Sequence, residues 1–512
     1  MKNKFLMKGK IAMGKNIYMV MVALGCLFAA CDEAEAPEQT SNNDLTVTTS
    51  VITTSYLGNG FQWDPYPQAY RYWETPISDA DWNTLYERMD FMRPSFMRVV
   101  YGSYDKYAAG GVDEYDEENY LEGLEKILQY CQDNNITVMI GDWGYNQVDL
   151  TNNRMVLNRV KNAARYLNFL IEDRGFTCIK YYNTINEPNL IGSATNGNYE
   201  LWRLMTRRFF QEFEALGNSN GVKIAGPDIA YFNPTDVDWV SQSARHLDDE
   251  IGLYDVHTYP PRESMFNGFY EETLKAMKDR TPAGSQIVIG EFGYKYDVGT
   301  SQMDQERNQR NQSNINADPN IGNDSNTLTE EYSHGVDLMG MVFKIINAGY
   351  AGAVNWGLDD AMHSDSETGQ DLKVWGVWNI LGEELLGKPE KELMRPHFYP
   401  YSLLTRYMQN GASVFEVQFE DMIGLDAIAV EKDGMRMLAF SNMHVEDHTI
   451  NLKFEDGVDL SGIKKFVYKE EGRVVDANGY PAPEEEGLTL SASGTSVTIP
   501  SNTFILFTNF DY

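Results

Sequence analysis

The chain has 512 residues, a formal net charge of −33 at pH 7 and 12% aromatic residues. So acidic a protein repels nucleic acid and anionic membrane surfaces, which excludes nucleic acid as an expected partner and favours a neutral one. A chain of this length is expected to form more than one domain.

The first thirty residues have the composition of a targeting segment. Five lysines precede an apolar stretch over residues 17–30, which is too short to span a bilayer. The stretch ends at Cys31 after Phe28-Ala-Ala, an arrangement that resembles a bacterial lipobox. We therefore expect a signal peptide over residues 1–30 and a lipid on Cys31 that anchors the protein to the outer membrane. The alternative is an ordinary cleaved signal peptide, and Cys26 is a second candidate for lipidation.

Residues 31–45 are acidic at their start and rich in Asn, Ser and Thr, which predicts a flexible tether. The acidic patch next to the cysteine resembles the export signal of surface lipoproteins in the polysaccharide-utilisation systems of gut bacteria. That resemblance implies a cell-surface location.

Strand-like apolar runs alternate with helical stretches over residues 46–408, which predicts an α/β fold with a parallel sheet. Runs without polar alternation, such as residues 136–140 and 287–289, are typical of strands covered on both faces. Eight strand–helix units predict a closed (β/α)8 TIM barrel. The eight strands are expected to end at Gln62, Arg98, Asp142, Glu187, Asp228, His257, Glu291 and Trp356.

One helix is expected to begin at Ser78-Asp-Ala-Asp81, and others are expected over residues 156–171 and 201–216. The sequence has no dinucleotide-binding or P-loop motif and no cluster of metal ligands, so no cofactor or metal is expected. Cys131 and Cys178 are too few for a disulfide framework and are expected to be buried thiols.

A Gln/Asn-rich insertion over residues 297–327 follows the seventh predicted strand. It is interpreted either as a mobile flap over the catalytic face or as a disordered surface loop. Residues 409–512 contain short strands separated by Gly, Asp and Pro, which predicts an antiparallel β-sandwich. This second domain is expected to stabilise the barrel; carbohydrate binding is the alternative. The whole chain is expected to be a monomer.

Two apolar strands end on glutamates: Glu187 in Thr-Ile-Asn-Glu-Pro-Asn and Glu291 in Ile-Val-Ile-Gly-Glu-Phe-Gly. Buried carboxylates at strand ends need a partner or a chemical role. This pair resembles clan A of the glycoside hydrolases, whose acid/base lies on strand four and whose nucleophile lies on strand seven. The resemblance implies that Glu187 is the acid/base and Glu291 the nucleophile of a retaining enzyme.

The same resemblance implies further substrate-contacting residues. Asn186 would bind the sugar 2-hydroxyl, and Arg98 would lie beside the nucleophile and, with Tyr259, lower the pKa of Glu291. His257 and Tyr259 match a His-x-Tyr motif, and Trp356 would lie under the sugar. Trp63 and Trp143 are aromatic residues that either stack on sugars or fill the core.

The substrate is expected to be a polysaccharide or oligosaccharide. The Gly-Glu-Phe-Gly motif resembles family 5, which implies an endo-acting enzyme on a β-glucan or β-mannan. The Asn-Glu-Pro-Asn motif and residues 395–406 resemble family 39, which implies an exo-β-glycosidase such as a β-xylosidase. A surface glycan-binding protein without catalytic activity is the other alternative.

Overall fold

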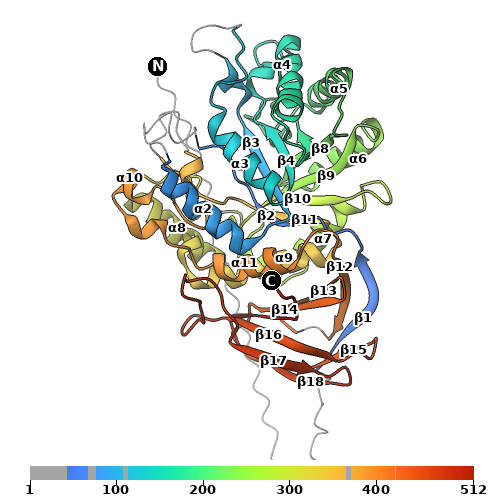
Figure 1. The fold of residues 1–512 in the computed structure, drawn as a ribbon, viewed down its shortest axis with the longest axis vertical. Helices are drawn as coiled ribbons and strands as arrows, with labels where there is room; N and C mark the ends of the chain where they lie inside the picture. Colours follow the sequence, from blue (N-terminus) through green and yellow to red (C-terminus); the bar gives the residue numbers. More distant parts are fainter. Residues whose placement is uncertain (1–42, 67–76, 108–113, 365–370, 421) are drawn as a thin grey trace, which may run out of the picture. The chain divides into compact units, whose positions relative to one another are not determined.

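The predicted α/β architecture is a closed barrel of eight parallel strands joined to a β-sandwich, as Figure 1 shows. The structure is a computed structural model that describes residues 43–66, 77–107, 114–364, 371–420 and 422–512. The expected signal peptide, Cys31 and nearly all of the expected tether lie outside the described residues. The predicted fold class, a TIM barrel with a C-terminal β-sandwich, is confirmed.

The barrel strands follow one another in chain order, and a parallel bridge between Gln62 and Arg98 closes the ring between the first and second strands. Their side chains are buried on both faces, as the unalternating apolar runs predict; in β10, for example, all six residues are buried. The strands are β2 (Gly58–Phe61), β3 (Phe96–Tyr101), β4 (Thr137–Asp142), β7 (Ile179–Asn183), β8 (Lys223–Tyr231), β9 (Ile251–Thr258), β10 (Ile287–Phe292) and β11 (Gly352–Asn355).

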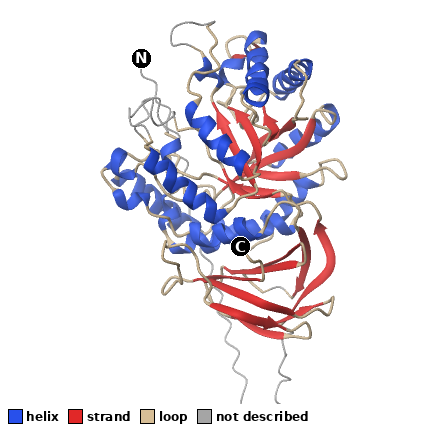
Figure 2. Ribbon diagram, in the orientation of Figure 1, coloured by secondary structure: helices blue, strands red, loops and turns tan. Residues whose placement is uncertain are grey.

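Helices lie around the barrel strands, as Figure 2 shows. The first begins as predicted, because the Ser78 hydroxyl accepts from the backbone N–H of Asp81 while the Asp81 carboxylate accepts from that of Ser78. Within the described part of the chain, no helix is both long and apolar enough to cross a membrane. The helices are α2 (Asp79–Met92), α3 (Glu122–Asp133), α4 (Leu157–Asn168), α5 (Tyr199–Ala215), α6 (Val237–His246), α7 (Phe269–Lys278), α8 (Gln302–Ala317), α9 (Tyr332–Asn347), α10 (Gly382–Leu386) and α11 (Phe398–Tyr407).

The Gln/Asn-rich insertion is folded, so the expected disordered surface loop is wrong, whereas the mobile flap stays a prediction. It contains α8, which begins with Ser301 as its N-cap and buries polar side chains. Arg307 forms an ion pair with the fully buried Asp337 of α9, and Asn311 donates to the backbone oxygen of Ser325 at 2.8 Å. The hydrogen bond holds the insertion together, since Ser325 also belongs to it, and the ion pair fixes the insertion to α9.

Nine strands form the curled sheet of the sandwich, and one of them comes from the other end of the chain. Residues 44–53, expected in the tether and the barrel, instead form β1, which pairs antiparallel with β12 and parallel with β15. The sandwich therefore begins before the barrel, contrary to the predicted boundary. Its strands are β1 (Asp44–Thr53), β12 (Ser413–Phe419), β13 (Leu425–Lys432), β14 (Met435–Asn442), β15 (His448–Phe454), β16 (Leu460–Tyr468), β17 (Glu485–Leu490), β18 (Thr495–Ile499) and β19 (Thr503–Thr508), and a separate hairpin is made by β5 (Val148–Asp149) and β6 (Arg154–Met155).

Helix α9 contacts both the barrel and the β-sandwich. Its Lys344 forms an ion pair with Asp426 of β13 at 3.0 Å, and its Val336 carbonyl accepts from the Ser441 hydroxyl at 3.0 Å. Cys131 and Cys178 are buried free thiols, as predicted.

Candidate active site

The two glutamates singled out by the sequence lie at the carboxyl ends of barrel strands. Glu291 is the fifth residue of β10 and is almost fully buried. Glu187 lies four residues beyond the end of β7 and keeps 20% of its side chain exposed. Its backbone has φ 46°, a left-handed conformation that costs a non-glycine residue about 1–3 kcal/mol. A hydrogen bond from its N–H to Asp228 Oδ2, at 3.2 Å, holds this conformation.

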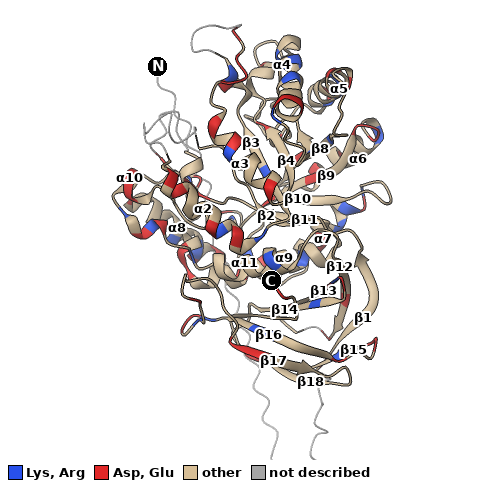
Figure 3. Ribbon diagram, in the orientation of Figure 1, with Lys and Arg blue, Asp and Glu red and all other residues tan. Residues whose placement is uncertain are grey.

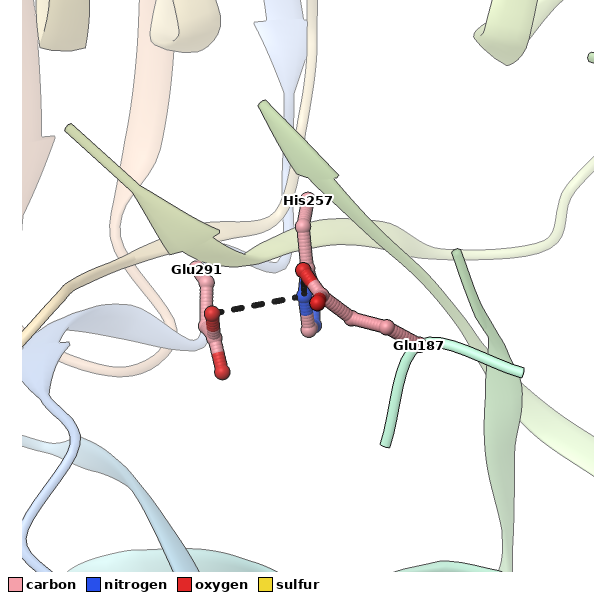
Figure 4. Close-up of side chains that lie close together, drawn as sticks. All are labelled: Glu187, His257 and Glu291. Atoms are coloured by element: carbon pink, nitrogen blue, oxygen red, sulfur yellow. Dashed lines mark hydrogen bonds and ion pairs between the residues drawn. The ribbon is translucent and has the colours of Figure 1, made fainter. Parts of the chain in front are cut away.

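The carboxylates of Glu187 and Glu291 face each other across His257 of β9, as Figure 4 shows. One oxygen of each glutamate and a ring nitrogen of His257 all lie within 4.8 Å of one another. His257 Nδ1 is 3.1 Å from Glu187 Oε1 and 3.5 Å from Glu291 Oε2. Two carboxyl groups this close can act on a single bond placed between them.

Arg98, in the middle of β3, has no exposed surface and connects four site residues. Its Nη1 donates to the side-chain oxygen of Gln62 and to Glu291 Oε1. Its Nη2 donates to Asn186 Oδ1 at 2.8 Å and to both oxygens of Asp228 at 3.1 Å. A planar guanidinium with several donors can hold two carboxylates in fixed orientations at once.

Asp228 is the second organising group of the site. It lies within β8 at φ 58°, fully buried, and accepts from His257 Nε2 at 3.0 Å as well as from Arg98. Burial opposes the ionisation of Asp228, but the charges of Arg98 and His257 outweigh it and lower its pKa. Asp255 of β9 lies beside it within 4.8 Å, and burial together with Asp228 raises the pKa of Asp255 well above its ordinary value.

Burial and the nearby charges have opposite effects on the pKa values of Glu291 and His257. Burial raises the pKa of Glu291 overall; Arg98 and Tyr259 lower it as expected, and so does His257, but burial outweighs them. Burial alone would lower the pKa of His257, but the negative charges of Glu291 and Asp228 raise it well above 6.5. The carboxylates of Glu291 and Asp228 therefore favour the charged form of the imidazole.

Aromatic rings surround the carboxylates at this end of the barrel. Tyr259 donates its hydroxyl to Glu291 Oε2 at 2.7 Å, and its ring packs edge-on against Trp375 with centroids 5.8 Å apart. Trp356 belongs to the same cluster, and Trp143 packs against it partly exposed. Trp63, by contrast, is fully buried and bonds to the Tyr66 hydroxyl at 3.1 Å, so it fills the core and the stacking alternative is wrong for it.

Most residues of the site were predicted from the sequence, but four were not. Gln62 and Asp228 were predicted only as strand ends, and Asp255 and Trp375 were given no role. An aspartate inside the apolar run of residues 224–230 is a signal that could have pointed to Asp228.

Among the residues that the structure describes, two groups of side chains have ligand atoms close enough for a metal ion: Glu187, His257 and Glu291, and Asp228, Asp255 and His257. The Arg98 guanidinium already lies against a carboxylate of each group, and the neighbouring carboxylates raise the pKa of His257, which favours its charged form. A cation would have to compete with both, so these residues fit a hydrogen-bonded acid–base site better than a metal site.

The sequence matches one protein-family model, described as Cellulase (glycosyl hydrolase family 5), over residues 57–322. No curated protein matches the chain. A family 30 subfamily 8 xylanase from Clostridium acetobutylicum is 12% identical, with TM-score 0.60 over 91% of this chain and 99% of that one. A family 39 β-xylosidase from Caulobacter crescentus has TM-score 0.57 at 10% identity, covering 91% and 99%. An endo-β-1,6-glucanase has TM-score 0.57 at 14% identity, covering 91% and 95%.

Proposed function

Since the chain belongs to the cellulase family, glycosyl hydrolase family 5, we propose that it cleaves internal β-glycosidic bonds in a neutral β-glucan or β-mannan. It is a glycoside hydrolase, and the open question is which bond it cuts. The observation that carries the proposal is the Glu187–Glu291 pair, with oxygens within 4.8 Å. Retaining enzymes place their carboxyl groups about 5–5.5 Å apart, whereas inverting enzymes need about 6.5–9.5 Å to admit a water.

The proposed reaction is a double displacement. Glu291 attacks the anomeric carbon, and Glu187 gives its proton to the glycosidic oxygen as the bond to the leaving sugar breaks. A covalent ester between Glu291 and the sugar results. Glu187, now ionised, takes a proton from water, whose oxygen attacks the same carbon and releases Glu291 as a carboxylate.

The residues around the pair supply orientation and charge. Arg98 and Tyr259 each bond to a different oxygen of Glu291, which fixes the plane of the nucleophile. Arg98 donates to the side-chain oxygen of Asn186, which turns the side-chain NH2 group of Asn186 into the donor for the sugar 2-hydroxyl. Such a bond strengthens as positive charge develops on the sugar. Trp356 and Trp143 would offer ring faces to the pyranose.

A neutral polymer suits the charge of the chain. Acidic and basic residues are interspersed over the barrel helices and the sandwich in Figure 3, and the sum is strongly negative. A polyanionic glycan would meet net repulsion. An exo-β-glycosidase is the second candidate, supported by the likeness to the β-xylosidase from Caulobacter crescentus.

The location of the protein is part of the proposal. The lipobox-like residues before Cys31 support a lipid anchor on the outer face of the outer membrane, and the protein is proposed to act there as a monomer. An endo-acting enzyme suits such a location, because a cell must shorten polymers before importing them. Incorporation of radiolabelled palmitate into the wild-type protein, and its loss in Cys31→Ala, would test the anchor.

The test of function is a screen of the protein against β-linked glucans, mannans and xylans, with products sized by chromatography. Glu291→Gln is the matched control, since it keeps the size of the side chain and removes the nucleophile. Mixed oligosaccharides that are absent with the variant support endo-action, and single sugars alone would move the proposal to exo-action. Binding of a polymer without any product would favour the glycan-binding alternative.

A further inference from the structure

Asp255 is a buried carboxyl group that the proposed reaction does not use. It lies in β9, on the same face of the strand as His257, and its side chain is fully buried. Among the described residues, no N–H or O–H group donates to either of its side-chain oxygens. An ionised carboxylate without a donor is costly to bury, whereas a protonated one carries a donor of its own and needs only an acceptor.

Irregularities in the two neighbouring strands bring Asp228 and Gly290 next to Asp255. The register of β8 against β9 shifts at Asp228, whose backbone has φ 58°. The register of β10 against β9 shifts at Gly290, the residue before the nucleophile. A Cβ atom at position 290 would lie 2.2 Å from Asp255 Oδ1, so a larger residue cannot stand there while Asp255 keeps its place. The absent side chain of Gly290 therefore gives the Asp255 carboxyl group its space.

Asp228 is the acceptor within reach of that group. One oxygen of Asp228 and one of Asp255 lie within 4.8 Å of each other. A carboxylate can accept about four hydrogen bonds. Three groups donate to Asp228, namely Arg98 Nη2, His257 Nε2 and the N–H of Glu187. Asp228 therefore has the capacity to accept one more hydrogen bond.

The uneven distribution of donors decides which of the two aspartates keeps a proton. Two carboxyl groups that share a buried site do not both ionise readily, and the donors around Asp228 favour its charged form. Asp255 has no such donors. Burial and the charge of Asp228 accordingly raise the pKa of Asp255 well above its ordinary value. Asp255 is thus the donor of the pair and Asp228 the acceptor.

We propose that Asp255 is a positioning residue, a neutral carboxylic acid that donates a hydrogen bond to Asp228 and so fixes the orientation of the Asp228 carboxylate. Its effect on turnover rests on the proposed roles of Glu187 and Glu291. Asp228 reaches Glu187 directly, through the N–H of that residue, and it reaches Glu291 through Arg98, which donates to both carboxylates. A displaced Asp228 would therefore disturb both glutamates.

Two variants separate the donor from the carboxyl group. Asp255→Leu has a similar size but no donor, whereas Asp255→Asn keeps an N–H donor and is uncharged like the neutral acid. On an aryl glycoside that the enzyme hydrolyses, Asp255→Leu should lose about ten-fold in kcat with little change in KM, because a hydrogen bond to a charged group is lost. Asp255→Asn should restore most of that activity. Equal losses in the two variants, or no loss in Asp255→Leu, would overturn the positioning role.

Infrared spectroscopy in deuterated buffer tests the hydrogen bond without any turnover. At mildly alkaline pH ordinary carboxyl groups are ionised, so a protonated-carboxyl band that wild type shows and Asp255→Asn lacks belongs to Asp255. In Asp228→Asn the band should move or vanish, since the charged acceptor has been replaced. A wild type without the band, or a band that Asp228→Asn leaves unchanged, would overturn the proposal. If the band behaves as expected but no glycoside is hydrolysed, the proposed function fails while the hydrogen bond stands.

Discussion

Asp228→Asn tests whether the catalytic glutamates depend on a carboxylate that touches neither substrate nor reacting atoms. Asp228 accepts from His257 Nε2 at 3.0 Å, from Arg98 at 3.1 Å and from the Glu187 N–H at 3.2 Å. Asparagine replaces one acceptor oxygen with an NH2 group that faces these donors. The loss of one hydrogen bond to a charged group is worth about 1.5–3 kcal/mol. If the loss falls on the transition state, kcat drops about 10- to 150-fold.

The assay is steady-state kinetics on an aryl glycoside that the enzyme hydrolyses, together with an NMR titration of the His257 imidazole. The pKa of His257 should fall in the variant, because one of the two carboxylates that raise it has gone. Asp255→Asn is the matched control: burial and Asp228 raise the pKa of Asp255, so asparagine resembles its neutral form. Unchanged kcat and unchanged His257 titration in Asp228→Asn would refute the reasoning.

Three further predictions concern the acid/base, a buried ion pair and pH. Glu187→Ala should lose about 100- to 10,000-fold on natural glycans but far less on dinitrophenyl glycosides, which need no proton; equal losses would contradict its role as the acid. Asp337→Asn leaves two buried arginines without their anion, so denaturant unfolding should show about 3–5 kcal/mol of destabilisation, and a change below about 1 kcal/mol would speak against it. Burial lowers the pKa of His334 to about 4, so the unfolded chain takes up this proton first and stability is lost as pH falls from 6.5 towards 4. The loss should be about 1.4 kcal/mol per pH unit and smaller in His334→Gln; an identical pH dependence in the two proteins would count against the assignment.

The barrel could be predicted because its strands are buried on both faces. Segments such as residues 287–289 carry no polar alternation, and several of them lead to a polar residue near the carboxyl end of the strand, as residues 287–289 lead to Glu291. The same rule led to Glu187 and Glu291. The Trp63 side chain could not be placed this way, since a tryptophan just after a strand can point to the centre or pack below a helix, and here it packs against Trp82.

Two features escaped the sequence for physical reasons. Helix α8 buries Asp304, Arg307 and Asn311, so its inner face is polar and leaves no apolar periodicity to detect. Strand β1 pairs with β12 and β15, which lie hundreds of residues later in the chain. The local sequence of residues 44–53 does not specify which strands it pairs with.

The position of β1 determines where a mechanical load enters the molecule. Tension applied to the chain ahead of Asp44 pulls first on β1, which pairs with β12 between Leu45 and Thr53 and with β15 between Asp44 and Val47. Such a load shears several inter-strand hydrogen bonds of the sandwich together instead of breaking them one by one. These bonds bear the tension before any barrel strand does.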